Sequence, residues 1–187
     1  RIYVGLVLFS GFQLSALFAY LNTVPFLYQG TFGLSESQFG LAFAMSGALS
    51  WLGVQIGARL PKVFPAQWLL LIYAFIGVGV GAGLVITSSM GEFWLAQAFF
   101  GLLLFNFGST LTSIQTIALL NHCEEAGTAA GLLGVSNFTF TSIFSLFYGL
   151  IITTNTTGVG FAIGALYLLA LISLVFVAQP RKISKLE

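Results

Sequence analysis

The sequence predicts an all-α polytopic membrane protein. Of its 187 residues, 58% are hydrophobic and only 6% are charged, and the mean hydropathy is +1.01. Water-soluble domains carry roughly 25% charged residues, so this composition excludes an ordinary soluble globule. The apolar residues form long runs near the ~20 residues that a membrane-spanning helix needs, and not the short alternating segments of a β-barrel.

Six such runs divide the chain. The expected spans are 2–27, 38–58, 68–87, 93–120, 127–153 and 159–178. Residues 1–187 are therefore expected to form one six-helix transmembrane domain. Ser35 and Gln38 fit a capping box at the start of the second span. Tyr28, at the end of the first span, fits an aromatic anchor at the membrane interface.

Small residues and prolines suggest how the second span packs. Gly53 and Gly57 have the spacing that lets two helix backbones approach closely in a membrane. The joint that follows is short and contains Pro61 and Pro65, which predicts that spans 38–58 and 68–87 are antiparallel neighbours.

The charged residues predict the orientation. With six spans, every Lys and Arg falls on the side that holds both termini and the joint with Arg59 and Lys62. The opposite joints carry only Glu36 and Glu92. Basic residues accumulate in cytoplasmic loops, so both termini are expected in the cytoplasm, most simply at a bacterial inner membrane. The net charge of +1 gives no basic patch, and no nucleic-acid partner is expected.

Polar side chains follow helical spacing in the two spans that flank residues 121–125. One stripe consists of Asn106, Ser109, Thr110 and Ser113, and the other of Asn137, Thr141, Ser145 and Tyr148. Each stripe forms one helix face. Because such a face is unfavourable against lipid, another helix or a water-filled cavity must lie opposite.

Interior amides occur in the first, second, fourth and fifth spans, whereas the third and sixth spans have none. The order polar, polar, apolar is thus repeated. It predicts two three-helix units around one cavity, as in secondary transporters. The glycine run 77–83 lies inside an apolar helix without the strand and turn of a nucleotide-binding motif, and it is interpreted as packing.

The sequence offers little for catalysis. No ionisable residue lies inside a span, and the chain contains no Asp. His122 and Cys123 have no further His or Cys with which to complete a metal site. No enzyme activity, cofactor or metal is therefore expected, and a proton-driven transporter would need its coupling carboxylate elsewhere.

Three stretches resemble the drug-efflux branch of the major facilitator superfamily called Bcr/CflA. The stretch 126–134, Ala-Gly-Thr-Ala-Ala-Gly-Leu-Leu-Gly, is similar to a segment at the start of that branch's eleventh helix. The motifs at 25–28, 32–35 and 38–40 resemble its seventh helix and outer loop, and Ala58-Arg59-Leu60 resembles the joint between helices eight and nine. The resemblance covers nearly the whole chain, as helices seven to twelve of a twelve-helix transporter.

That resemblance implies the C-terminal half of a secondary-active exporter of drugs or small amphipathic molecules, with proton-coupled antiport. An N-terminal six-helix half, absent from this chain, would be its partner. Surrounded by membrane lipid, the two halves would open the substrate site alternately to the two sides of the membrane. The expected substrate contacts are amides, hydroxyls and adaptable aromatic rings. The hydrogen-bonding candidates are Gln13, Tyr20, Asn106, Thr110, Gln115, Asn137 and Thr141. The aromatic candidates are Phe9, Phe12, Phe105 and Phe138.

Two other functions fit the same residues. Two copies of the chain could form a homodimeric transporter, each supplying one half. Alternatively, the chain could be a non-transporting membrane assembly module whose polar stripes only hold helices together.

Overall fold

The computed structural model describes residues 2–120, 126–151 and 156–178, and these residues form an all-α bundle without strands. Its six long helices are α1 (Ile2–Phe26), α2 (Glu36–Arg59), α3 (Ala66–Met90), α4 (Phe93–Leu120), α5 (Ala126–Ile151) and α6 (Thr156–Ser173). Short helical turns follow α1, α2 and α6, at Leu27–Thr31, Leu60–Lys62 and Leu174–Ala178. The predicted fold class is confirmed.

Five of the helices are long and apolar enough to cross a membrane, judged by length and composition. In α5, the comparable apolar stretch among the described residues is shorter, Ala130–Leu146. The helix itself is 26 residues long. At a rise of about 1.5 Å per residue, that length suffices for a bilayer core of about 30 Å.

Local signals set the helix ends. α2 begins with the predicted capping box, in which the Ser35 hydroxyl accepts from the Gln38 backbone N–H at 3.3 Å. The Ser35 N–H donates in return to the Gln38 side chain at 2.9 Å. α3 ends at Gly91, whose φ of 66° lies in the left-handed region that glycine adopts without strain.

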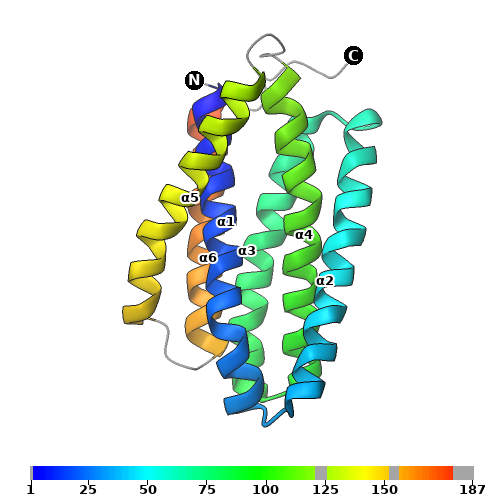
Figure 1. Cartoon of the computed structure of the whole chain (residues 1–187), viewed down its shortest axis with the longest axis vertical. Coiled ribbons are helices and arrows are strands. Elements are labelled where there is room, and N and C mark those ends of the chain that lie inside the picture. The colour runs from blue at the N-terminus through cyan, green and yellow to red at the C-terminus, as the bar shows by residue number, and fades with distance from the viewer. Residues whose placement is uncertain (1, 121–125, 152–155, 179–187) are drawn as a thin grey trace.

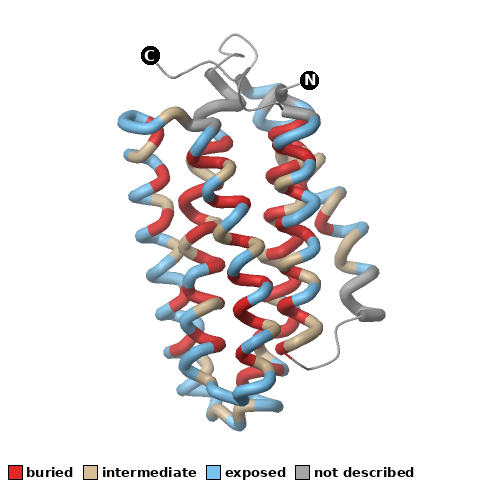
Figure 2. Tube along the Cα trace, turned by 180° about the vertical axis from the view of Figure 1, so that it is seen from behind, coloured by how far each residue is buried: buried red, intermediate tan, exposed pale blue. Residues whose placement is uncertain are grey.

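The helices pack as two layers (Figures 1 and 2). α5, α1, α4 and α2 follow one another across the face seen in Figure 1, and α3 and α6 lie behind them. The main contacts join α1 to α5 and α6, α4 to α2 and α3, and α3 to α6. This pattern is unchanged when α1–α3 are exchanged with α4–α6. Because α1 and α4 run in opposite directions in Figure 1, the two units form an inverted repeat.

The closest backbone approach joins α2 to α4. A Cβ atom added at Gly53 would overlap the carbonyl oxygen of Phe105, and one at Gly57 would overlap that of Ser109. Gly108 of α4 lies equally close to the Ser50 carbonyl of α2. The predicted glycine contact is therefore present, and its partner is α4.

The predicted pairing of the second and third spans is wrong. α2 and α3 are consecutive, but α2 packs along α4 whereas α3 packs along α6. The small face of α2, which allows close packing, points to α4. In α3, Gly81 fits in the same way against Gly160 and Gly164 of α6. Within the glycine run 77–83, Gly77, Gly81 and Gly83 thus serve helix packing, as interpreted from the sequence, whereas nothing lies within 4 Å of a Cβ added at Gly79.

The α2–α4 contact can be tested with a single methyl group. Gly53→Ala places a Cβ against backbone that cannot move aside without separating the helices, so we expect a loss of about 1–3 kcal/mol. Gly47→Ala, in the same helix, is the matched control because nothing lies within 4 Å of its added Cβ. Thermal unfolding of the purified protein in detergent measures both. Equal midpoints for the two variants would contradict the assigned contact.

Candidate functional site

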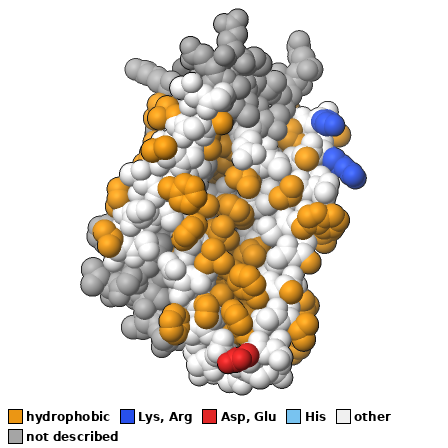
Figure 3. All heavy atoms as spheres, viewed as in Figure 1, with side chains coloured by type: hydrophobic (Ala, Val, Ile, Leu, Met, Phe, Trp, Pro, Cys, Tyr) orange, Lys and Arg blue, Asp and Glu red, His pale blue; other side chains and the backbone are white. Residues whose placement is uncertain are grey.

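The face formed by α5, α1, α4 and α2 carries a band of hydrophobic side chains (Figure 3). In that view the basic side chains lie near one end of the molecule and an acidic side chain lies at the other. Arg59 and Lys62 are exposed where α2 ends, and Glu36 and Glu92 are exposed at the opposite helix ends. The face is therefore apolar at membrane depth and charged only near its ends.

Seven of the predicted substrate contacts are buried, and five of these lie on α1 and α4. They are Phe9, Gln13, Tyr20, Asn106 and Thr110. The Asn106 Nδ2 donates to the backbone carbonyl of Tyr73 at 3.0 Å and to the Tyr167 hydroxyl at 3.3 Å. Thr110 donates to the carbonyl of Asn106 in its own helix at 2.7 Å. The two bonds of Asn106 join α4 to α3 and α6, whereas the bond of Thr110 lies within α4.

A second group joins α5 to α1. The Ser10 hydroxyl donates to Asn137 Oδ1 at 2.6 Å, and both side chains are buried. Thr141 is buried beside them and donates to the Asn137 carbonyl at 2.8 Å. Phe12 of α1 packs against Phe140 of α5, with ring centroids 5.7 Å apart. The α5 stripe therefore faces α1 through its first two members.

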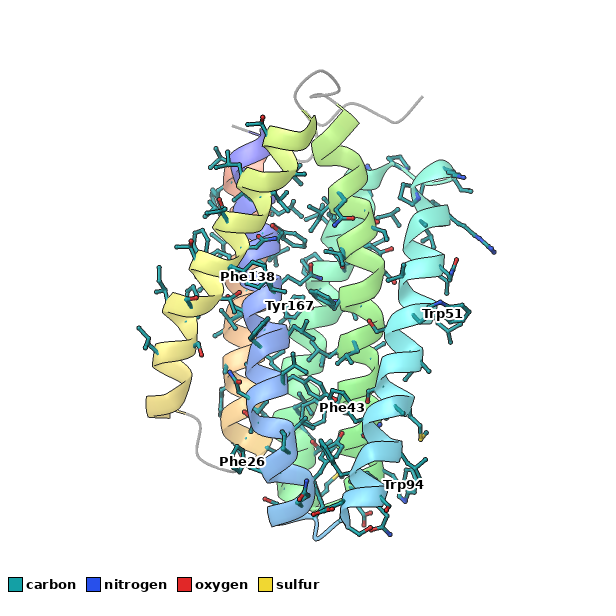
Figure 4. The ribbon with its side chains drawn as sticks, in the orientation of Figure 1. Phe26, Phe43, Trp51, Trp94, Phe138 and Tyr167 are labelled. Carbon is teal, nitrogen blue, oxygen red and sulfur yellow. The ribbon has the colours of Figure 1, made fainter. Side chains whose placement is uncertain are left out.

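The remaining predicted contacts are more accessible. Phe12 and Phe105 are half-buried, and Gln115 is exposed. Phe138 is 62% exposed, and Figure 4 shows it near mid-height on α5. The eleven candidates thus form an interior group, a group between α1 and α5, and an accessible group. Their role in substrate binding stays a prediction.

The serines of the α4 stripe bind another helix. Ser109 donates to the carbonyl of Gly53 at 3.0 Å, and Ser113 donates to that of Gly57 at 3.4 Å. Both carbonyls belong to the glycine face of α2. The sequence left open whether this stripe faces another helix or a water-filled cavity. For Ser109 and Ser113, it faces another helix, α2.

Tyr28 is placed differently from the prediction. It is fully buried and does not serve as an interfacial anchor. The π-helical turn Leu27–Thr31 follows Pro25, and Tyr28 lies within it, packed edge-on against Phe93 with ring centroids 5.3 Å apart. Its hydroxyl donates to Gln97 Oε1. In the sequence, Gln97 is an amide inside the predicted span 93–120, and a buried amide of this kind indicates that a polar side chain lies opposite it.

Gln97 connects three helices. Its Nε2 donates to the carbonyl of Ala42 at 2.9 Å and to the Ser46 hydroxyl at 3.0 Å. Together with the bond from Tyr28, these contacts join α2 and α4 to the end of α1. Beside them lies an open pocket of about 570 Å³ whose apolar lining includes Phe93, Trp94 and Met45. None of the eleven predicted contacts lines this pocket.

Within the described ranges, no three metal-ligating side chains come together. His122 and Cys123, for which the sequence predicts no metal site, belong to residues 121–125, which lie outside the described residues.

The chain is similar to two transporters. It is 30% identical over 156 residues to the uncharacterized MFS-type transporter YdgK of Bacillus subtilis, covering 82% of this chain and 39% of YdgK. It is 23% identical over 188 residues to the multidrug resistance protein MdtL of a Shewanella species, covering 98% of this chain and 46% of MdtL. The chain thus spans less than half the length of each relative. No family model and no solved structure matches it.

The hydrogen bond between Tyr28 and Gln97 is expected to stabilise the fold, which a substitution can test. Tyr28→Phe leaves the buried Gln97 Oε1 without its donor, so we expect a loss of about 1–3 kcal/mol. Tyr20→Phe is the matched control. Tyr20 is also fully buried, but its hydroxyl makes no hydrogen bond within the described part of the chain. Thermal midpoints of the two variants should therefore differ, with Tyr28→Phe the lower. Equal losses would count against the bond.

Proposed function

We propose that the chain is the C-terminal six-helix half of a major facilitator superfamily exporter of drugs or small amphipathic molecules. The similarity to YdgK and MdtL, whose lengths it covers by less than half, is the observation that carries this proposal. The inverted pair of three-helix units supports it, because secondary transporters place their substrate at the interface between repeats.

The face of α5, α1, α4 and α2 is the proposed wall of the substrate cavity. It is broad and apolar, and Phe138, Phe12 and Phe105 provide aromatic surface that is at least partly accessible. Such a surface suits amphipathic molecules of varied shape, since apolar contacts impose few directional requirements. Asn137 and Thr141 are buried at the α1–α5 contact and would hold α5 against α1, whereas the exposed Gln115 would add a hydrogen bond near the cytoplasmic end.

The buried candidates have an indirect role in this proposal. Asn106 and Thr110 use their donors within the bundle, and Gln13, Tyr20 and Phe9 are enclosed by it. They would hold α1 and α4 in the geometry that presents the accessible residues to a substrate. A substrate that displaced these contacts would have to separate packed helices.

Energy coupling is proposed to reside outside this chain. Among the described residues, the carboxylates are Glu36 and Glu92, and both are exposed at helix ends. A proton carrier at membrane depth needs a buried carboxyl group or an equivalent. We assign that role to an N-terminal half that rocks against this one during antiport.

The cavity wall can be tested through Phe138. In the complete protein, Phe138→Ala should lower cellular drug resistance about 5-fold or more, because it removes roughly 1–2 kcal/mol of apolar contact with the substrate. Phe161→Ala is the matched control, since Phe161 of α6 is 64% exposed but belongs to the opposite layer. Unchanged resistance for both variants at equal expression would remove Phe138 from the site. Resistance conferred by this chain alone would instead favour a homodimer.

The orientation can be tested by cysteine labelling. With Cys123 replaced by Ser, Glu92→Cys should react with a membrane-impermeant maleimide in intact cells, because that helix end is expected outside. Lys62→Cys should react only after the membrane is permeabilised. The reverse pattern would invert the proposed topology.

A further inference from the structure

The centre of the bundle contains buried polar atoms that no contact between helices pairs and that the proposed cavity does not use. Gln13 lies near the middle of α1, and Asn106 lies near the middle of α4. Their exposed fractions are 2% and 1%. Asn106 contacts the Tyr73 carbonyl and the Tyr167 hydroxyl, and the Gln13 amide lies beside that same hydroxyl. We call Gln13, Asn106 and Tyr167 the central node.

Two atoms of the central node have no partner within the described part of the chain. They are Gln13 Nε2 and Asn106 Oδ1. The orientation of the Asn106 amide is fixed, because the Tyr73 carbonyl can only accept and must therefore face Nδ2. Its Oδ1 is consequently an acceptor that needs a donor, whereas Gln13 Nε2 is a donor that needs an acceptor.

Gln97 shows that a buried amide of this bundle can be fully paired, whereas the two node atoms, like the Tyr20 and Tyr73 hydroxyls, have no partner within the described part of the chain. It is a buried amide of the same helix as Asn106, but its Oε1 accepts from Tyr28 and its Nε2 donates to Ala42 and Ser46. In an apolar surrounding, an unpaired polar atom is costly, and buried polar atoms nearly always find a partner. A buried water typically makes two to four hydrogen bonds to such atoms.

We propose that the central node is a binding site for a water molecule, which accepts from Gln13 Nε2 and donates to Asn106 Oδ1 beside the Tyr167 hydroxyl. The water joins the two inverted units through the first helix of each, α1 and α4. Tyr167 brings in the third helix of the second unit, and the Tyr73 carbonyl brings in that of the first. The site thus ties all four central helices at one point. This inference does not depend on the transport activity.

Radiolytic labelling tests the site directly. X-ray irradiation turns bound water into hydroxyl radicals that oxidise the adjacent side chain, and mass spectrometry measures the oxidation. In the complete protein, reconstituted in lipid nanodiscs, Tyr167 should be oxidised several times faster than Tyr28. Tyr28 is the matched control because it is equally buried and bonded to Gln97. Equal rates for the two tyrosines would overturn the proposal.

A substitution provides the second readout. Gln13→Leu removes the water's donor, so the thermal midpoint should fall by about 3–8 °C. Thr110→Val is the matched control, because Thr110 is equally buried but bonds only to its own helix. A dry node would give the opposite result, since replacing an unpaired amide with an apolar side chain would leave the midpoint unchanged or raise it. Either of these outcomes for Gln13→Leu would also overturn the proposal.

Discussion

The need to pair polar groups away from bulk water governs this bundle. In a membrane, each backbone N–H and C=O group must be bonded within its helix, and polar side chains must find partners on other helices, on their own backbone or on bound water. Ser109 and Ser113 meet this requirement by bonding to carbonyls of α2. Those bonds need two helix backbones in near contact, which the glycines of α2 permit. Close packing and polar pairing therefore depend on each other.

The same requirement separates the two layers by composition. α3 and α6 meet through glycines and carry no interior amide, whereas Gln13, Gln97, Asn106 and Asn137 lie on α1, α4 and α5. The central helices α1 and α4 contact helices of both layers and also each other. They therefore have more neighbours with which their amides can be paired. Position in the bundle and polarity are in this way correlated.

Much of the fold follows from the sequence. Hydropathy places the helices, and the capping box at Ser35 marks the start of α2. The order of polar and apolar spans indicates the repeat. The pairing of α2 with α4 could not be deduced, because glycine spacing shows that a close contact exists but not with which helix. The inward position of Tyr28 could not be predicted either, because it depends on a π-helical turn that has no clear sequence signal.

For the candidate site, helical spacing identified the polar faces of α4 and α5 but could not say what lies opposite them. Asn106 and Asn137 are both buried amides in mid-helix, yet one contacts α3 and α6 and the other contacts Ser10 of α1. Only the three-dimensional arrangement distinguishes them. Accessibility also depends on that arrangement, and it separates Phe138 from Phe9 although both are phenylalanines in apolar spans.

The helix contacts stay the same when the two three-helix units are exchanged, so the packing of the helices does not depend on their order along the chain. Since α1–α3 and α4–α6 occupy equivalent places, the contacts do not depend on which unit comes first. The turn Leu174–Ala178 lies against α1, so the start and the end of the described chain are neighbours. A circular permutant that joins them and opens the chain between α3 and α4 would keep every helix pair. Both of its new termini would emerge on the opposite side of the membrane. In this bundle, the location of the chain ends is thus a property of the connections and not of the packed core.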